Sequence, residues 1–135
     1  MNGAEGPETA ARLVKWLQTG DDPGDLFAPN AFGDLTLPHW RLQADNRADL
    51  ITIRKNGHAG PSDVTVERLE PTPRGWVMQM EERWIDDQGH SWYCREMFLA
   101  DVAGGMIQEI SIFCGGDWDE AAVQRHAAEV KLIRP

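Results

Sequence analysis

Residues 75–131 constrain the fold most strongly, because they predict three consecutive β-strands followed by a helix. Glycine-bearing turns at Gln88-Gly89 and Gly104-Gly105 separate the strands, and both are typical of tight hairpins. The last strand then runs into the helix, whose start is indicated by Asp117 with Glu120 three residues later as a capping box. A strand meander that leads into a helix predicts an α+β fold with a largely antiparallel sheet.

The pairing of the strands follows from the two turns, because a two-residue loop at the later turn places Ala103 opposite Met106. The same loop length at the earlier turn places Asp87 opposite His90. Since side chains alternate along a strand, both ladders then put one set of residues on a single face, which we expect to be the concave, covered side of the sheet. That set is Trp76, Met78, Met80, Glu82, Trp84, Tyr93, Arg95, Met97, Leu99, Ile110, Ile112 and Cys114. The assignment depends on register, because a slip of one residue exchanges the two faces of a strand.

The opposite face of the predicted sheet carries apolar side chains among its charges. They are Val77, Trp92, Cys94, Phe98 and Phe113. An apolar patch of this kind indicates contact with another chain, so we expect a homodimer through Trp92, Phe98 and Phe113. The alternative is a monomer with scattered hydrophobic residues on its surface.

The first half of the chain predicts helices and two further strands. In chain order these are a helix from Pro7 to Gly20, a short helix from Asp22 to Pro29, a strand at Phe32–Pro38, a helix at Asp45–Gly57 and a strand at Asp63–Leu69. The segment Asp45–Gly57 is ambiguous, because Asn46 and Asp49 resemble a capping pair whereas Leu50–Arg54 would also satisfy a strand. We interpret it as a helix.

Composition limits the partners and cofactors. The chain has 135 residues, which fits one domain over residues 1–135, and its net charge of −9 would repel nucleic acid and anionic membranes. No apolar run is long enough to span a membrane and the start lacks the pattern of a signal peptide, so we expect a cytoplasmic protein. Cys94 and Cys114 are expected to be reduced. No metal-binding or nucleotide-binding motif is present, so neither a metal nor another cofactor is predicted.

Glu82 and Arg95 form the sharpest candidate for a catalytic pair, since the predicted register places them opposite each other on the covered face. An ion pair among methionine and tryptophan side chains is costly to bury unless it has further hydrogen bonds. In the functional interpretation, Glu82 acts as a general base or orients water, and Arg95 polarises a substrate oxygen. The alternative is a structural salt bridge at the mouth of a pocket.

Two other residues have weaker functional interpretations. His39 follows the first predicted strand together with Trp40, and it would titrate near neutral pH at the opening of a pocket; alternatively it is a solvated loop residue. Cys114, at the floor of the pocket, would be a nucleophile only if a neighbour activated it. A packed, unreactive thiol is the simpler interpretation of Cys114.

The covered face also predicts which residues line the pocket. Six tryptophans in so short a chain suit a wide, aromatic cavity. The expected lining residues are Trp40, Trp76, Met78, Met80, Trp84, Tyr93, Met97, Ile112 and Cys114. Such a cavity would bind a small apolar metabolite.

The order of helix, short helix, strand, helix and curved meander, ending in Ile112-Phe-Cys-Gly-Gly-Asp-Trp118, resembles the nuclear transport factor 2-like (NTF2-like) cone and specifically its SnoaL-like branch. The resemblance implies an α+β cone in which a curved, mixed or antiparallel sheet wraps around N-terminal helices, with an apolar pocket, a C-terminal helix and commonly a dimer. The family includes ketosteroid isomerases, polyketide cyclases, epoxide hydrolases and binding proteins without known chemistry. The fold therefore does not select the function.

The catalytic residues of the family mostly do not carry over to this sequence. Leu37 stands where ketosteroid isomerases have a carboxylate base, Met97 stands near their protonated aspartate, and Ile112 stands near the aspartate of SnoaL-type cyclases. Epoxide hydrolases set an arginine beside carboxylates in an apolar cavity, and Glu82 with Arg95 matches that arrangement in chemistry but not in position. The resemblance thus implies a cofactor-independent enzyme of cyclase, dehydratase, isomerase or epoxide-hydrolase type acting on an apolar oxygenated metabolite. The alternative is a non-catalytic ligand-binding or dimeric scaffold protein.

Overall fold

The structure is a computed structural model that describes residues 5–58 and 60–135, in which three helices accompany one seven-stranded sheet. In chain order the elements are α1 (Glu5–Thr19), β1 (Phe27–Leu37), β2 (Trp40–Ala44), α2 (Arg47–His58), β3 (Asp63–Thr72), β4 (Gly75–Ile85), β5 (Ser91–Ala103), β6 (Met106–Cys114), β7 (Trp118–Asp119) and α3 (Glu120–Glu129). The strands lie in the order β2-β1-β6-β5-β4-β3, and the short β7 pairs with β5. The β1–β6 pair is parallel and the other pairs are antiparallel. This mixed, curved sheet with helices confirms the predicted α+β fold class.

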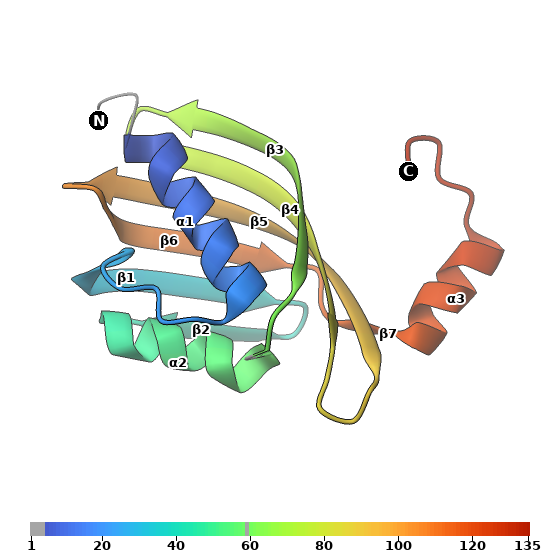
Figure 1. Cartoon of the computed structure of the whole chain (residues 1–135). Coiled ribbons are helices and arrows are strands. Elements are labelled where there is room, and N and C mark those ends of the chain that lie inside the picture. Colours follow the sequence, from blue (N-terminus) through green and yellow to red (C-terminus); the bar gives the residue numbers. More distant parts are fainter. Residues whose placement is uncertain (1–4, 59) are drawn as a thin grey trace.

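Helices α1 and α2 lie on the concave side of the sheet and cover it (Figure 1). Helix α1 buries Ala10, Leu13 and Leu17, as their spacing along the sequence predicts. Gly20 ends the helix with a φ of 72°, and its N–H donates to the carbonyl of Trp16. Residues 1–4, which belong to the segment where no signal peptide was expected, lie outside the described residues. No helix within the described ranges is long and apolar enough to cross a membrane.

The predicted short helix after Asp22 is wrong. The carboxylate of Asp22 accepts a hydrogen bond from the N–H of Gly24, which closes a turn and not a helix. Strand β1 begins directly afterwards at Phe27, five residues before the predicted strand. Pro29 is tolerated there because the pairing of β1 with β6 is interrupted between Phe27 and Phe32.

The ambiguous segment after Asp45 is the helix α2, as predicted. The side chain of Asn46 accepts a hydrogen bond from the N–H of Asp49 at 2.9 Å, and its amide donates to the carboxylate of Asp49. This reciprocal cap satisfies a free N–H group of the first turn. The helix buries Leu50 against the sheet.

The two predicted hairpins exist, but neither keeps the predicted register. At the later hairpin Ala103 does lie opposite Met106, and a bulge between Asp101 and Val102 then shifts the pairing by one residue. The earlier hairpin has a three-residue loop, Asp87–Gly89, in which Gly89 has a φ of 81°. Three-residue loops with a glycine in the left-handed region are the next most common hairpins after two-residue ones.

Each shift amounts to one residue of β5, so the predicted faces of β4 and β6 are right and that of β5 is wrong. In β5 the concave face carries Cys94, Glu96, Phe98 and Ala100, all buried. The residues predicted to face inward instead lie on the convex face. They are Tyr93, Arg95, Met97 and Leu99.

The predicted dimer contact is affected by the same slip. Phe98 is buried in the core, and Trp92 lies opposite Trp84 on the concave side. Phe113 does lie on the convex face, where it is 60% exposed beside its strand partner Met97. The apolar patch of the convex face therefore exists with a different membership.

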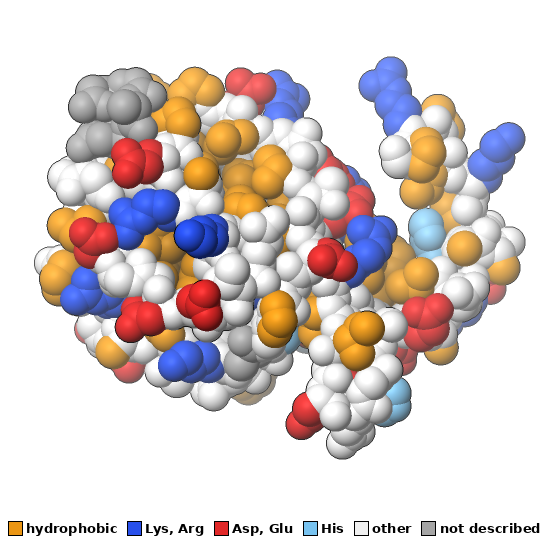
Figure 2. Space-filling view, in the orientation of Figure 1, with side chains coloured by type: hydrophobic (Ala, Val, Ile, Leu, Met, Phe, Trp, Pro, Cys, Tyr) orange, Lys and Arg blue, Asp and Glu red, His pale blue; other side chains and the backbone are white. Residues whose placement is uncertain are grey.

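Helix α3 begins two residues later than the predicted cap, because Asp119 and not Asp117 accepts the capping hydrogen bond, from the N–H of Ala122. The intervening Trp118 and Asp119 form β7, which pairs with β5. We expected α3 to close the core, yet none of its residues is buried. It stands apart from the body of the molecule (Figures 1 and 2).

Replacing Gly75 by alanine is expected to lower the free energy of unfolding by about 2–3 kcal/mol, because the new methyl group would overpack the start of β4. A Cβ at Gly75 would lie 1.9 Å from the carbonyl oxygen of Ala100, which as backbone cannot move aside. Gly57 in α2 is the matched control, since a Cβ there meets open space. Urea unfolding should show Gly57→Ala equal to or more stable than wild type, whereas equal stability of Gly75→Ala would refute the close approach.

Candidate active site

The cavity most suited to a ligand lies between the two covering helices and the concave face of the sheet, and its volume is about 390 Å³. Its walls are mainly apolar and come from α1, α2, β1, β2, β5 and β6. The apolar side chains are Leu13, Trp16, Leu17, Phe27, Leu35, Leu37, Leu42, Leu50, Ile53, Phe98, Ile110 and Ile112. Arg54, His58, Glu96, Cys114 and Asp117 line one end of the cavity, and the other polar side chains in its lining are Asp34 and Asn56. Apolar walls with a few convergent polar groups are typical of small-molecule sites.

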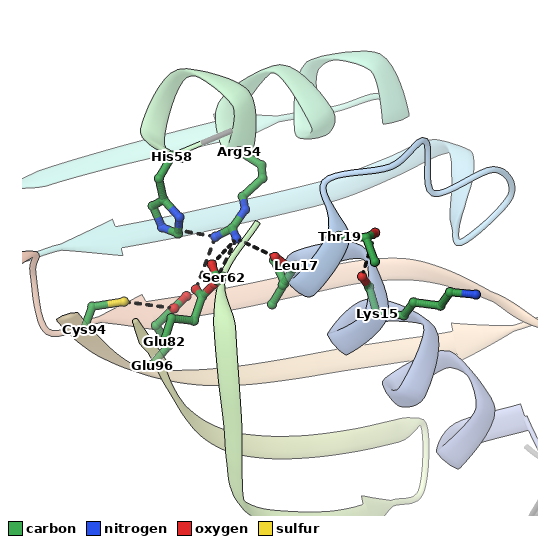
Figure 3. Close-up of polar contacts among 9 residues, drawn as sticks. All are labelled: Lys15, Leu17, Thr19, Arg54, His58, Ser62, Glu82, Cys94 and Glu96. Atoms are coloured by element: carbon green, nitrogen blue, oxygen red, sulfur yellow. Dashed lines mark hydrogen bonds and ion pairs between the residues drawn. The ribbon is translucent and has the colours of Figure 1, made fainter. Parts of the chain in front are cut away.

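A buried ion pair between Arg54 and Glu82 anchors this polar end (Figure 3). Glu82 is fully buried, and the guanidinium group of Arg54 donates to both of its oxygens, at 2.8 and 3.2 Å. Arg54 also donates to the carbonyl of Leu17 at 3.2 Å and to the hydroxyl of Ser62 at 3.1 Å. Ser62 in turn donates to Glu82 at 2.8 Å. Each charge therefore has the additional hydrogen bonds that a buried ion pair needs.

Glu96 lies next to Glu82 and is the carboxyl group that reaches the cavity. Burial and the hydrogen bond and negative charge of Glu82 raise the pKa of Glu96 well above its usual value. Burial opposes ionisation of Glu82 as well, but hydrogen bonds from Glu96 and Arg54 and the charge of Arg54 lower the pKa of Glu82 to about 2. The two shifts have opposite directions, so a proton shared by the pair resides on Glu96 in preference to Glu82.

His58 is held neutral at the same end of the cavity. Its Nε2 lies 3.1 Å from Nη1 of Arg54, which can only donate, so Nε2 is the acceptor and the ring proton is on Nδ1. The ring stacks on Trp84 with centroids 3.8 Å apart. Burial and the charge of Arg54 lower the pKa of His58 to about 4. Among the described residues, Nδ1 of His58 is buried without a hydrogen-bond partner.

The lowered pKa of His58 predicts a stability that falls in acid. The unfolded chain binds a proton at His58 below the ordinary histidine pKa of 6.5, whereas the folded protein binds it only below about 4. The free energy of unfolding should therefore fall by about 2–3 kcal/mol from this group as the pH drops through that window. Urea unfolding of His58→Gln should lack this part of the slope, and His39→Gln, at an exposed position, should keep it. An unchanged slope in His58→Gln would contradict the assignment.

Potential metal ligands also gather at this end of the cavity. One group is His58, Cys94 and Asp117, and another is Cys94, Glu96 and Cys114, with the ligand atoms of each group within 4.8 Å of one another. The hydrogen bonds compete with metal binding, because Nε2 of His58 accepts from Arg54 and the thiol of Cys94 donates to Glu96 at 3.1 Å. A metal would have to displace these protons and hydrogen bonds, so we interpret the cluster as a hydrogen-bonded network. Its members come from α2, β5, β6 and the β6–β7 connection, and no sequence motif indicates them.

The predicted pairing of Glu82 with Arg95 is wrong. Arg95 lies on the convex face with its side chain 52% exposed, and it pairs there with Glu67 at 2.6 Å. The cause is the slip of β5, which puts Cys94 opposite Glu82 in place of Arg95. The catalytic centre that the sequence predicted from these two residues is therefore absent, and the partner of Glu82 is Arg54.

The structure places the other predicted site residues in three settings. Ile112 and Cys114 line the cavity as expected. Trp76, Met78 and Met80 are buried in the core behind α1, and Trp84 lies behind His58. His39 and Trp40 are exposed at the β1–β2 turn, while Tyr93 and Met97 lie on the convex face.

Sequence reasoning missed Arg54, His58 and Glu96. The signal for Arg54 was present, because Leu50, Ile53 and Arg54 share one face of a helix at the spacing of a buried stripe. His58 follows Arg54 by one helical turn, so it lies on the same face. Glu96 had no independent signal, since its position depends on the register of β5.

Comparison with known proteins gives relatives in structure and not in sequence. No protein-family model matches the chain, and no curated protein matches its sequence. An NTF-2 like protein of unknown function from Burkholderia xenovorans LB400 is 17% identical over 96% of this chain and 95% of its own, with a TM-score of 0.60. SalBIII, an epoxide hydrolase/cyclase-like enzyme with a role in pyran ring formation, is 14% identical over 83% of this chain and 95% of its own, with a TM-score of 0.68. The Delta 5-3-ketosteroid isomerase from a Mycobacterium species is 20% identical over 87% of this chain and 95% of its own, with a TM-score of 0.65.

Proposed function

We propose that this chain, which has the NTF2-like fold, is a cofactor-independent enzyme that performs acid–base chemistry on a small, apolar, oxygenated molecule. The observation that carries the proposal is the carboxyl group of Glu96, which lines the polar end of an apolar cavity and is buried against Glu82, so that burial and the negative charge of Glu82 favour its protonated form. The single O–H of Glu96 is donated to Glu82 in the free protein, and a substrate oxygen bound in the cavity would take that hydrogen bond or the proton in place of Glu82.

Glu82 and Arg54 have a supporting role in this proposal. Glu82 does not line the cavity, and its two oxygens already accept hydrogen bonds from Arg54 and Ser62. The two charges cancel, so the pair adds no net charge to the apolar surroundings. Its effect is to fix the proton on Glu96, because a second carboxylate beside Glu82 would be repelled.

Asp117 is the group that we propose as the base. It is exposed as a residue, yet its carboxylate lies within 4.8 Å of His58 and Cys94 at the cavity. Burial there and the negative charge of Glu82 raise the pKa of Asp117. Isomerisation, dehydration, cyclisation and epoxide opening each need one group that takes a proton and another that donates to oxygen, and Asp117 with Glu96 supplies both.

Structural neighbours support this class of reaction without selecting one member of it. They include an isomerase and an epoxide hydrolase/cyclase-like enzyme, at identities that carry the fold alone. The SnoaL-like branch is the part of the superfamily that we favour. The alternative function is a non-catalytic binding protein, for which the apolar walls of the cavity would be sufficient.

The experiment that separates the two functions is a turnover screen of the wild-type and Glu96→Gln proteins. The panel should contain unsaturated ketones, hydroxy ketones and epoxides of a size that fits about 390 Å³. Turnover that depends on Glu96 supports the enzyme. Tight binding of panel members without any turnover supports the non-catalytic binding protein.

We further propose that a second copy of the chain covers the convex face, as the sequence predicts, although through a revised patch. Met97, Leu99 and Phe113 are large, exposed and apolar there. Met97 and Phe113 are strand partners, so the patch is continuous across β5 and β6. A cytoplasmic location remains the prediction made from the sequence.

A further inference from the structure

A second cavity, of about 630 Å³, adjoins the first at its polar end. It lies between the C-terminal end of α2, the β4–β5 hairpin and Asp117. Gly57, His58 and Asp117 line both cavities, so the two are adjacent. The first cavity has mainly apolar walls, whereas the second is lined by tryptophans and carboxylates. A single ligand that occupies both would need an apolar part and a part of different chemistry.

Two indole rings form the aromatic wall of the second cavity. Trp84 and Trp92 lie opposite each other on β4 and β5, on the concave side of the sheet. Two hydrogen-bonding or stacking contacts fix them: Trp84 stacks on His58, and Nε1 of Trp92 donates to Asp86 at 3.0 Å. The face of an indole ring attracts a cation more strongly than that of any other side chain.

The charges around the second cavity are negative. Asp86, Asp87 and Asp117 line it, and among its described lining residues none is a lysine or an arginine. The guanidinium group of Arg54, which contacts His58, is neutralised by Glu82. The C-terminal end of α2 adds the partial negative charge of its free carbonyl groups. Aromatic faces and negative charge together favour a cation.

An organic cation fits this wall better than a metal ion. Asp86 already accepts hydrogen bonds from the N–H groups of Gln88 and His90 and from Trp92, so its oxygens are occupied. Hard metal ions require six or more oxygen ligands, whereas aromatic faces are typical of sites for alkylated ammonium groups. A bulky ammonium group is stabilised by contact with the faces of the indole rings and needs no directly coordinating oxygen.

We propose that the second cavity binds an alkylated ammonium group whose apolar remainder extends into the first cavity. The binding site follows from the walls of the cavities alone. The statement that such a molecule is the substrate rests on the proposed function, and it narrows the substrate class to small amphiphilic amines with an oxygen near Glu96.

The test uses two probes of equal shape, trimethyl(2-phenoxyethyl)ammonium and 3,3-dimethylbutyl phenyl ether, in which carbon replaces the charged nitrogen. Binding is measured by calorimetry and by tryptophan fluorescence. The ammonium probe should bind wild type at least about tenfold more tightly than the ether, since a desolvated cation–aromatic contact is of that size. Equal binding of the two probes, or no binding of the ammonium probe, would overturn the proposal.

Variants locate the site. Trp92→Leu and Asp117→Asn should each remove most of the advantage of the ammonium probe, whereas Trp92→Phe, which keeps an aromatic face, should retain part of it. The matched controls are Trp40→Leu and Asp21→Asn, at exposed positions outside both cavities. Equal losses in the controls would place the binding elsewhere and refute the site.

The same measurements separate this inference from the proposed enzyme. Glu96→Gln should keep the preference for the ammonium probe over the ether, because both probes carry the same oxygen and Glu96 does not line the second cavity, where the probes differ. Selective binding without any Glu96-dependent turnover would support the cation site and refute the proposed enzyme. Glu96-dependent turnover without selective binding would support the enzyme and refute the cation site.

Discussion

Turnover by the Glu96→Gln protein is expected to fall by about two to four orders of magnitude, the usual contribution of a positioned acid or base. Glutamine has nearly the shape of the protonated carboxyl group, so the variant should fold and bind ligands normally. It can still donate a hydrogen bond, but it cannot give up a proton. The expected result is therefore a lower kcat with little change in KM.

Two controls make the Glu96 result specific. Glu109→Gln makes the same chemical change at an exposed position on β6 and should leave turnover unaffected. The wild-type rate should fall as the pH rises through the raised pKa of Glu96, because only the protonated form donates. A Glu96→Gln protein with the wild-type rate on a turned-over substrate would contradict the proposed proton donor.

Replacing Arg54 by methionine is expected to lower the free energy of unfolding by about 3–5 kcal/mol, the usual cost of leaving a buried charge without its partner. Glu82 is fully buried and would lose the bidentate hydrogen bonds of the guanidinium group. Burial would then raise the pKa of Glu82 and drive it to take up a proton. Urea unfolding at neutral pH measures the change.

The double variant Arg54→Met with Glu82→Gln separates lost charge compensation from lost packing. It should recover a large part of the loss, since no unpaired charge remains. Arg95→Met is the matched control, because its ion pair with Glu67 is exposed and should contribute less than about 1 kcal/mol. An Arg54→Met protein that loses no more stability than Arg95→Met would show that the Arg54–Glu82 pair does not hold this fold together.

Local sequence signals were sufficient for most of the fold. The buried spacing of α1, the cap at Asn46 and the paired glycines at Gly104 each act within a few residues, and each element lies where it was predicted. The NTF2-like fold expected from their order is confirmed. The register of β5 failed because a glycine ends a two-residue and a three-residue loop alike, so Gly89 does not distinguish them.

The site required information that is not local. Glu82 was predicted correctly as a buried acid, because neither register shift changes which side chains of β4 lie on the concave face. Its partner comes from α2, at a separation of 28 residues, and nothing in a strand pattern indicates a helix that folds over it. The predicted register was wrong by one residue, so it placed Arg95 on the concave face in place of its neighbour Glu96. The prediction therefore named a residue of a surface ion pair and missed the proposed proton donor.

The contacts of Arg54 restrict how a lineage of such proteins can change. One planar cation touches α1 through Leu17, the α2–β3 connection through Ser62, and β4 through Glu82. Lysine has a single nitrogen with three hydrogens, so it could not donate to the carbonyl of Leu17, the hydroxyl of Ser62 and both oxygens of Glu82 at the same time. Exchange of aliphatic side chains at Leu35, Leu42 or Ile112 would therefore change the ligand preference at less cost than a substitution of Arg54 alone, which would loosen three segments at once.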